Sequence, residues 1–172
     1  MASQGYYDQI SEGYEELHRE EQEAKLRLIK AEIQAIWGFE SIDTLLDVGC
    51  GTGLTSDFRE YNIDVTGADP AKKLLEKAKK KGLKSFRPVP AEAESLPFRD
   101  NEFDLVISIT AIQNFNDIEK GLKEIKRVGK NRFALSFLKR SPKKDRIMGL
   151  ISKIFKTIKT IEEDKDMIIL AE

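Results

Sequence analysis

The sequence predicts an α/β fold, in which helices cover both faces of a doubly wound, mostly parallel sheet of seven strands. Short apolar segments of strand length alternate with segments whose apolar residues recur at helical spacing. A loop with three alternating glycines directly follows the first strand. Segment 104–110 is apolar enough to be buried on both faces, as the central strands of parallel sheets are. Strands and helices that alternate in this way form parallel sheets with right-handed connections.

The boundaries of the elements follow from apolar runs and from residues that start or stop helices. The predicted strands are 44–48, 64–69, 84–89, 104–110, 132–138, 157–161 and 167–170. The predicted helices are 26–37, 54–61, 70–82, 116–128 and 142–154. Gly38 ends the first helix, while Pro70 opens the third and Gly82 ends it. Asn116 or Asp117 can cap the fourth.

We expect a single domain over residues 1–172, because neither a repeat nor a linker interrupts this alternation. Residues 1–38 would form lid helices at the N-terminus, and residues 44–172 would form the core. A turn at 164–166 separates the last two predicted strands, which should therefore form an antiparallel hairpin at the end of the sheet.

Composition narrows the function classes. The chain has 172 residues, 40% of them hydrophobic, and a formal net charge of -1, which argues against a surface that is basic throughout. Its one cysteine, Cys50, has no internal disulfide partner, which favours a reducing compartment. No apolar run approaches the roughly 18 residues of a membrane span. A cytoplasmic location and no membrane partner are therefore expected.

The glycine loop carries the strongest functional signal. Asp47 is followed by Gly49, Gly51 and Gly53, which gives the pattern D-x-G-x-G-x-G between a strand and a helix-like segment. Glycines let backbone N–H groups approach a ligand that Cβ atoms would keep away. A dinucleotide-binding loop has the pattern G-x-G-x-x-G, and the place of its third glycine is taken here by Leu54. The spacing therefore disfavours a nicotinamide-dependent oxidoreductase.

This loop, with Asp69 at the end of the second strand, resembles the S-adenosylmethionine-binding motif of class I methyltransferases. Segments 90–98 and 103–106 resemble the third and fourth motifs of that family, in the branch that includes quinone-biosynthesis and tRNA or rRNA methyltransferases. The tyrosine-containing segment 6–14 resembles the start of proteins in the same branch. The resemblance implies a Rossmann-like fold, S-adenosylmethionine as cofactor and S-adenosylhomocysteine as product.

The resemblance also implies the residues that hold the cofactor. The matching positions are Asp47, Gly49, Gly51, Gly53, Asp69, Pro70, Glu92, Ala93 and Ile109. The glycines would lie against the methionine part of the cofactor, and Asp47 would position its amino group. Asp69 would accept the ribose hydroxyls, although an acid before a proline can also be a simple helix cap.

The adenine would lie between Pro70, Glu92 and Ala93, and Ile109 and Thr110 would close the pocket at the end of the fourth strand. Glu92 stands where the family more often has aspartate, so a solvated loop acid is the competing interpretation. Cys50 is interpreted as a small packing residue rather than a nucleophile, since no neighbour in the sequence would lower its pKa.

Methyl transfer from a sulfonium needs alignment of the acceptor rather than a protein nucleophile. The candidates for a catalytic role are His18, Tyr14 and, in the loop 110–116, Asn114. Tyr14 and His18 are one helical turn apart and can share a face, but a lone exposed helical histidine is the favoured interpretation of His18. With one histidine and one cysteine in the chain, no metal site is expected.

The acceptor is not identified by the sequence. The basic segment 139–146 leads directly into a helix, without the extra helices that cover small hydrophobic substrates in related proteins. An RNA or protein acceptor is therefore the leading hypothesis. Segment 111–113 resembles the corresponding loop of rRNA and tRNA methyltransferases that work with a small activator subunit. A small-molecule methyltransferase and a non-catalytic cofactor-binding subunit remain as alternatives.

Overall fold

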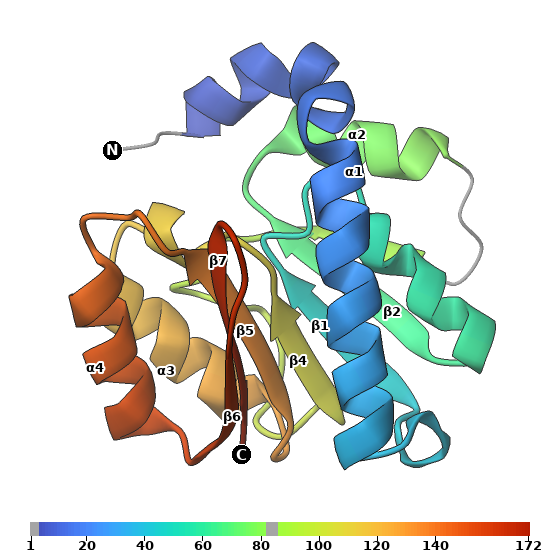
Figure 1. Ribbon diagram of the computed structural model, residues 1–172. Helices are drawn as coiled ribbons and strands as arrows, with labels where there is room; N and C mark the ends of the chain where they lie inside the picture. Colours follow the sequence, from blue (N-terminus) through green and yellow to red (C-terminus); the bar gives the residue numbers. More distant parts are fainter. Residues whose placement is uncertain (1–3, 82–85) are drawn as a thin grey trace.

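The computed structural model describes the backbone of residues 4–81 and 86–172, and the side chains of residues 19–81 and 86–172. One twisted sheet of seven strands forms the centre of the molecule, with the strand order β3-β2-β1-β4-β5-β7-β6 (Figure 1). Strands β1 to β5 pair in parallel, whereas β7 runs antiparallel to both of its neighbours. The strands are β1 (Thr44–Val48), β2 (Asp64–Asp69), β3 (Phe86–Pro90), β4 (Leu105–Ser108), β5 (Phe133–Leu138), β6 (Thr157–Glu162) and β7 (Asp166–Ala171).

Helices connect the strands and lie on both faces of the sheet (Figure 1). The α-helices are α1 (Gln4–Ile36), α2 (Lys72–Lys80), α3 (Ile118–Val128) and α4 (Lys144–Ile154), and the 3-10 helices are η1 (Phe39–Ser41), η2 (Leu54–Tyr61) and η3 (Ile112–Asn114). Asp117 caps α3, since its carboxylate accepts a hydrogen bond from the Lys120 N–H at 3.1 Å. The predicted α/β class, seven strands and terminal hairpin are confirmed.

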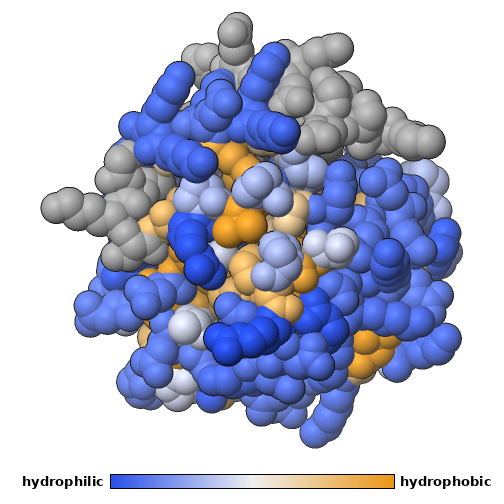
Figure 2. All heavy atoms as spheres, turned by 180° about the vertical axis from the view of Figure 1, so that it is seen from behind, coloured by the Kyte–Doolittle hydropathy of each residue, from blue (hydrophilic) through white to orange (hydrophobic). Residues whose placement is uncertain are grey.

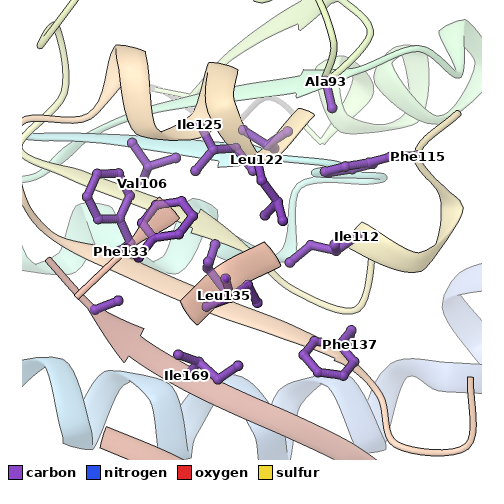
Figure 3. Close-up of a cluster of buried hydrophobic side chains, with 14 of the residues drawn as sticks. Ala93, Val106, Ile112, Phe115, Leu122, Ile125, Phe133, Leu135, Phe137 and Ile169 are labelled. Carbon is purple, nitrogen blue, oxygen red and sulfur yellow. The ribbon is translucent and has the colours of Figure 1, made fainter. Parts of the chain in front are cut away.

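Two hydrophobic clusters hold these layers together. One cluster packs α3 and α4 against one face of the sheet, and Figure 3 shows Leu122 and Ile125 of α3 above Val106 of β4. The other packs α1 and η2 against the opposite face, where Ile29, Ile33 and Phe58 are fully buried. Because both faces are covered, the central strands need no polar alternation, as their sequence predicted.

The strand order reverses between β1 and β4, which pair with each other in parallel. At such a point the loops after adjacent strands leave the sheet in opposite directions, and a crevice opens at the carboxyl ends of the strands. The glycine loop follows β1 and the loop 110–116 follows β4. The fold therefore brings these two loops to the two sides of one crevice.

Several predicted boundaries were wrong. The fourth strand ends at Ser108, because Thr110 has φ 55° and this left-handed conformation breaks the ladder. The helix expected to open at Pro70 begins at Lys72, and segment 54–61 is a 3-10 helix. One continuous helix, α1, stands where several N-terminal helices were predicted. The predicted helix end at Gly82 and the first residues of the predicted strand 84–89 lie outside the described residues.

Candidate functional site

The glycine loop (residues 49–53) is a tight turn at the carboxyl end of β1. Gly49, Gly51 and Gly53 have φ values of 81°, 53° and 80°, a region in which residues with a Cβ are strained. A side chain at Gly49 would collide with Ala111 of the loop after β4. The three glycines are therefore required by the backbone, and Gly49 also by the close approach of the opposite loop.

The carbonyl of Ala68, in β2, fixes the start of this turn. It accepts hydrogen bonds from the Gly49 N–H at 2.7 Å and the Cys50 N–H at 3.2 Å. The Cys50 side chain fills the space above Gly67, where an added Cβ would lie 2.6 Å from its sulfur. Burial, followed by the charges of Asp47 and Asp69, raises the pKa of the Cys50 thiol. Cys50 is thus a buried packing residue and not a reactive one.

Asp69 ends β2 and connects two segments of the site. One carboxylate oxygen accepts the Gly51 N–H at 2.9 Å, and the other accepts the Ala71 N–H at 2.8 Å. The carboxylate therefore holds the glycine loop and the start of α2 in fixed positions. A carboxylate oxygen can accept more than one hydrogen bond, so the chemical type of Asp69 also suits a ligand that carries hydroxyl groups.

Asp47 is buried beneath the glycine loop. Its Oδ2 accepts a hydrogen bond from the Thr55 hydroxyl at 2.6 Å, whereas its Oδ1 is buried and has no hydrogen-bond partner among the described residues. Burial raises the pKa of Asp47 to about 7, the Thr55 hydrogen bond opposes the shift, and the charge of Asp69 adds to it. A buried acceptor without a donor is costly, so this oxygen is suited to receive a cationic or N–H group of a ligand.

A cleft opens between the two loops and has two chambers. The main chamber is lined by Gly49, Gly51, Asp69, Pro70, Ala71, Leu74, Ala91, Glu92, Ala93, Glu94, Ile109, Thr110, Ala111, Asn114, Phe115 and Asn116. The small chamber beneath the glycine loop is lined by Gln22, Leu26, Asp47, Gly49, Cys50, Gly51, Thr52, Leu54, Thr55 and Ile109. Gly49, Gly51 and Ile109 are shared, so the chambers adjoin. In the space-filling view from behind, apolar residues gather within a hydrophilic surround (Figure 2).

The charge of the cleft is one-sided. Asp47, Asp69, Glu92 and Glu94 line it, whereas no lysine or arginine is among its described lining residues. Partial burial, with the charges of Glu94 and Asp69, raises the pKa of Glu92. Four carboxylates attract a cationic ligand and repel a pyrophosphate. The cleft is therefore electrostatically unsuited to a dinucleotide.

The loop after β4 (residues 110–116) is anchored in the core. Ile112 is fully buried and Phe115 is 9% exposed, and both extend into the cluster beneath α3 (Figure 3). Asn114 lies in this loop and lines the main chamber. It also lines a neighbouring groove, whose other lining residues are Gln113, Leu138, Arg140, Ser141, Pro142, Asp164 and Lys165. A second molecule in the groove would therefore meet the cleft at Asn114.

The structure brings most of the predicted site residues together, but not all. Gly49, Gly51, Asp69, Pro70, Glu92, Ala93, Ile109 and Asn114 line the main chamber, and Asp47 lines the small one. Gly53 faces Phe86 and Ala78 instead, so it shapes the turn without lining either chamber. Tyr14 and His18 are in α1, but their side chains lie outside the described residues.

Sequence reasoning missed a buried ion pair beside the cleft. Lys25 in α1 and Asp166 at the start of β7 lie 2.7 Å apart, and both contact Thr110. In the sequence, neither residue differs from an ordinary charged surface residue, so no local pattern indicates that the two are buried and paired.

Two further features are absent from the part of the chain that the structure describes. No group of three or more histidine, cysteine, aspartate or glutamate residues is placed there to hold a metal ion. None of the helices in that part combines the length and the apolar character that crossing a membrane requires.

Comparison with known proteins places the chain among methyltransferases. The family model described as "Methyltransferase domain" matches residues 46–135, about half of the chain. The demethylmenaquinone methyltransferase of Thermotoga maritima is 32% identical over 103 residues, which cover 58% of this chain and 44% of that enzyme. The chain spans 35% and 49% of the length of two other curated relatives.

Solved structures share the fold at low sequence identity. A SAM-dependent methyltransferase from Aquifex aeolicus superimposes with a TM-score of 0.68 and 20% identity, covering 80% of this chain and 87% of that one. A complex between the Haloferax volcanii Trm112 methyltransferase activator and a methyltransferase gives a TM-score of 0.79 and 15% identity, covering 96% of each chain. The matched family model spans both the glycine loop and Asp69. The chain therefore belongs to the methyltransferase domain family, the class I, S-adenosylmethionine-dependent methyltransferases that its motifs resemble.

Proposed function

We propose that this chain transfers a methyl group from S-adenosylmethionine to an acceptor that enters along the groove beside Asn114. The observation that carries the proposal is the acidic cleft at the carboxyl ends of β1 and β4, in which one buried oxygen of Asp47 has no hydrogen-bond partner among the described residues. S-adenosylmethionine carries a sulfonium and an ammonium group, which suit a cleft lined by carboxylates. A nicotinamide dinucleotide carries a pyrophosphate, which this cleft would repel.

The residues present fit the cofactor in two parts. The small chamber would take the methionine part, with the ammonium group at the free oxygen of Asp47 and the backbone of Gly49 and Gly51 alongside. The main chamber would take the nucleoside, with the ribose hydroxyls at Asp69. Pro70, Ala93 and Glu92 would surround the adenine. Gly53 would act only by shaping the turn. The residues that bind the cofactor would be Asp47, Gly49, Gly51, Asp69, Pro70, Glu92, Ala93 and Ile109.

The bound cofactor would supply an activated methyl group on its sulfur, so the chain needs no nucleophile of its own. The protein aligns the acceptor with that methyl group and keeps the site free of competing molecules. The side-chain amide of Asn114 lies where the groove meets the cleft, and it can hydrogen-bond an acceptor there.

A macromolecular acceptor, RNA or protein, is favoured by the open groove. The connection from β5 to β6 contains only α4, so the described chain places no extra helix over the groove. The basic segment predicted at 139–146 is partly engaged within the molecule. Lys139 pairs with Glu162 at 3.1 Å, and Lys143 donates to the Gln113 carbonyl at 2.8 Å, while Arg140 lines the groove.

A small-molecule acceptor is the second candidate function, and the similarity to demethylmenaquinone methyltransferase favours it. A small activator subunit is a further part of the proposal. It is supported by the structural similarity to the methyltransferase in complex with Trm112, and by the short sequence resemblance at 111–113.

The experiment that tests the function is transfer of a labelled methyl group from S-adenosylmethionine. The purified chain is incubated with RNA, protein and small-molecule fractions of the source cells, with and without native extract. Label in the RNA or protein fraction is the expected result, and label among small molecules alone would favour the second candidate. Dependence on extract would support an activator. If the chain binds the cofactor but no fraction becomes labelled, the chain is a non-catalytic subunit and the proposal is contradicted.

A further inference from the structure

A buried ion pair joins α1 to the C-terminal hairpin next to the cleft. The ammonium of Lys25 lies 2.7 Å from the Oδ2 of Asp166, and the two side chains are only 4% and 2% exposed. The residues come from opposite ends of the chain, and neither lies in a motif of the methyltransferase family model. Burying two charges costs solvation that their attraction offsets only when the geometry is good and the other polar atoms are bonded.

Thr110 completes this geometry. Its hydroxyl group accepts a hydrogen bond from the Lys25 ammonium at 2.6 Å, and its O–H donates one to the Oδ1 of Asp166 at 3.0 Å. Both oxygens of Asp166 are thus engaged. We call Lys25, Asp166 and Thr110 the polar triad.

The backbone of Thr110 is held as firmly as its side chain. Its N–H donates to the carbonyl of Ser136 at 3.1 Å and to the Ser136 hydroxyl at 2.9 Å. Its carbonyl accepts from the side-chain amide of Gln113 at 2.7 Å. The φ of 55° is unfavourable for a β-branched residue, and such a conformation persists only where the surroundings impose it. The polar triad contributes part of the contacts that hold Thr110 in this conformation.

The position of Thr110 shapes the cleft. Its neighbours on either side are Ile109, which lines both chambers, and Ala111, whose side chain lies against Gly49. The helix that carries Lys25 also carries Gln22 and Leu26, which line the small chamber. The same ion pair therefore fixes one wall of the cleft and the helix that covers its small chamber.

We propose that the polar triad is a positioning device: it seats α1 and holds residues 109–111 against the glycine loop, so that the cleft has the width its ligand needs. This inference rests on the proposed function, because the test uses the product S-adenosylhomocysteine as ligand. Lys25 and Asp166 act through Thr110 and the loop, not by touching the reacting atoms.

The test compares binding of S-adenosylhomocysteine with thermal stability. The double variant Lys25→Met/Asp166→Leu removes both charges together and puts apolar side chains of similar size in their place, so we expect it to fold. Its dissociation constant for S-adenosylhomocysteine should rise at least tenfold, because residues 109–111 lose their anchor. Thr110→Val should weaken binding in the same direction, whereas Thr110→Ser keeps the hydroxyl and should bind within about twofold of the wild type.

A purely structural role would lower the unfolding temperature of these variants and leave the dissociation constant unchanged. A folded double variant that binds as tightly as the wild type therefore overturns the inference. If the double variant does not fold, the comparison of Thr110→Val with Thr110→Ser decides, and equal affinities overturn the inference. Absence of binding by the wild type itself would reject the proposed function and this inference together.

Discussion

At the scale of single residues, the site contains a buried carboxylate oxygen that lacks a partner in the described part of the chain and a glycine that no other residue can replace. The carboxylate is that of Asp47, with one oxygen bonded to Thr55 and the other buried without a partner among the described residues. Gly49 lies so close to Ala111 that no side chain fits between the two loops. The buried Oδ1 of Asp47 lowers stability in a cleft that accepts a ligand, as binding sites commonly do, whereas Gly49 is the residue that allows the two loops to approach.

Asp47 should make the stability of the protein depend on pH. Its pKa is about 7 in the folded state against 3.8 in the unfolded chain, so the folded state binds the proton more tightly. The contribution is therefore fully present below pH 4 and is lost as the pH rises to about 7, in total about 4 kcal/mol. Denaturant unfolding of the wild type and Asp47→Asn from pH 5 to 8 measures it. The difference between the two proteins should change with pH, and a constant difference would contradict the raised pKa.

Gly49 should tolerate no side chain. Gly49→Ala forces a left-handed backbone on alanine and drives its Cβ into Ala111, so we expect a loss of about 2–4 kcal/mol in unfolding free energy. Gly149→Ala is the matched control, because this helical position faces open space and should gain about 0.5–1 kcal/mol. Thermal unfolding compares them. Equal stability of Gly49→Ala and the wild type would show that the two loops lie further apart than described.

How well the sequence predicts a site residue depends on how local its signal is. Gly49, Gly51 and Asp69 were predicted because the turn and the strand end place them within a short, recognisable pattern. Lys25 and Asp166 could not be predicted, because their pairing depends on how α1 and the hairpin pack, and isolated charges in a sequence rich in lysine and glutamate are normally solvated. Gly53 shares the pattern but faces Phe86, a contact that only the fold creates.

At the scale of elements, one arginine holds the segment that carries Glu92 and Ala93. Arg127 of α3 donates to the carbonyls of Phe98 at 2.8 Å and Leu96 at 3.0 Å. It also forms a two-pronged pair with Glu124, which in turn accepts the Leu96 N–H. Segment 91–100 contains no helix or strand, so these side-chain hydrogen bonds hold its backbone in place of the regular hydrogen bonds of a helix or sheet.

Arg127→Met should therefore loosen this segment. We expect about 1–2 kcal/mol of lost stability, faster amide hydrogen exchange over residues 91–100 and weaker cofactor binding. Arg127→Lys should not restore the wild type, because an ammonium cannot reproduce the forked geometry. Arg99→Met is the control, since Arg99 is 92% exposed and its ion pair with Glu102 is long at 3.9 Å. Unchanged exchange in Arg127→Met would show that the segment is held by other contacts.

The β3 edge of the sheet offers few hydrogen-bond donors to a further strand. The Ala91 N–H bonds to the Asp69 carbonyl in β2, and in a parallel ladder alternate residues face the same neighbour. Pro88 and Pro90 therefore face the open edge of β3, where they supply no N–H group. Prolines at such positions protect an edge against the addition of a further strand.

At the scale of the whole molecule, the fold explains why distant motifs form one site. Parallel strands deliver every following loop to the same end of the sheet, and the reversal of strand order between β1 and β4 opens the crevice there. This much follows from alternating patterns in the sequence, which is why the fold class and the hairpin could be predicted. The strand end at Ser108 could not, because the left-handed residue Thr110 is held by contacts with α1, β5 and β7 that are distant in the sequence.

The most direct test of the account is calorimetric titration of the wild-type chain with S-adenosylmethionine and, separately, with NAD. We expect saturable binding of S-adenosylmethionine and no binding of NAD. Because the ammonium group would bind ionised Asp47, binding should release close to one proton at pH 6, seen as heats that depend on the ionisation enthalpy of the buffer. Asp47→Asn should abolish the proton release. Binding of NAD without binding of S-adenosylmethionine would contradict the account.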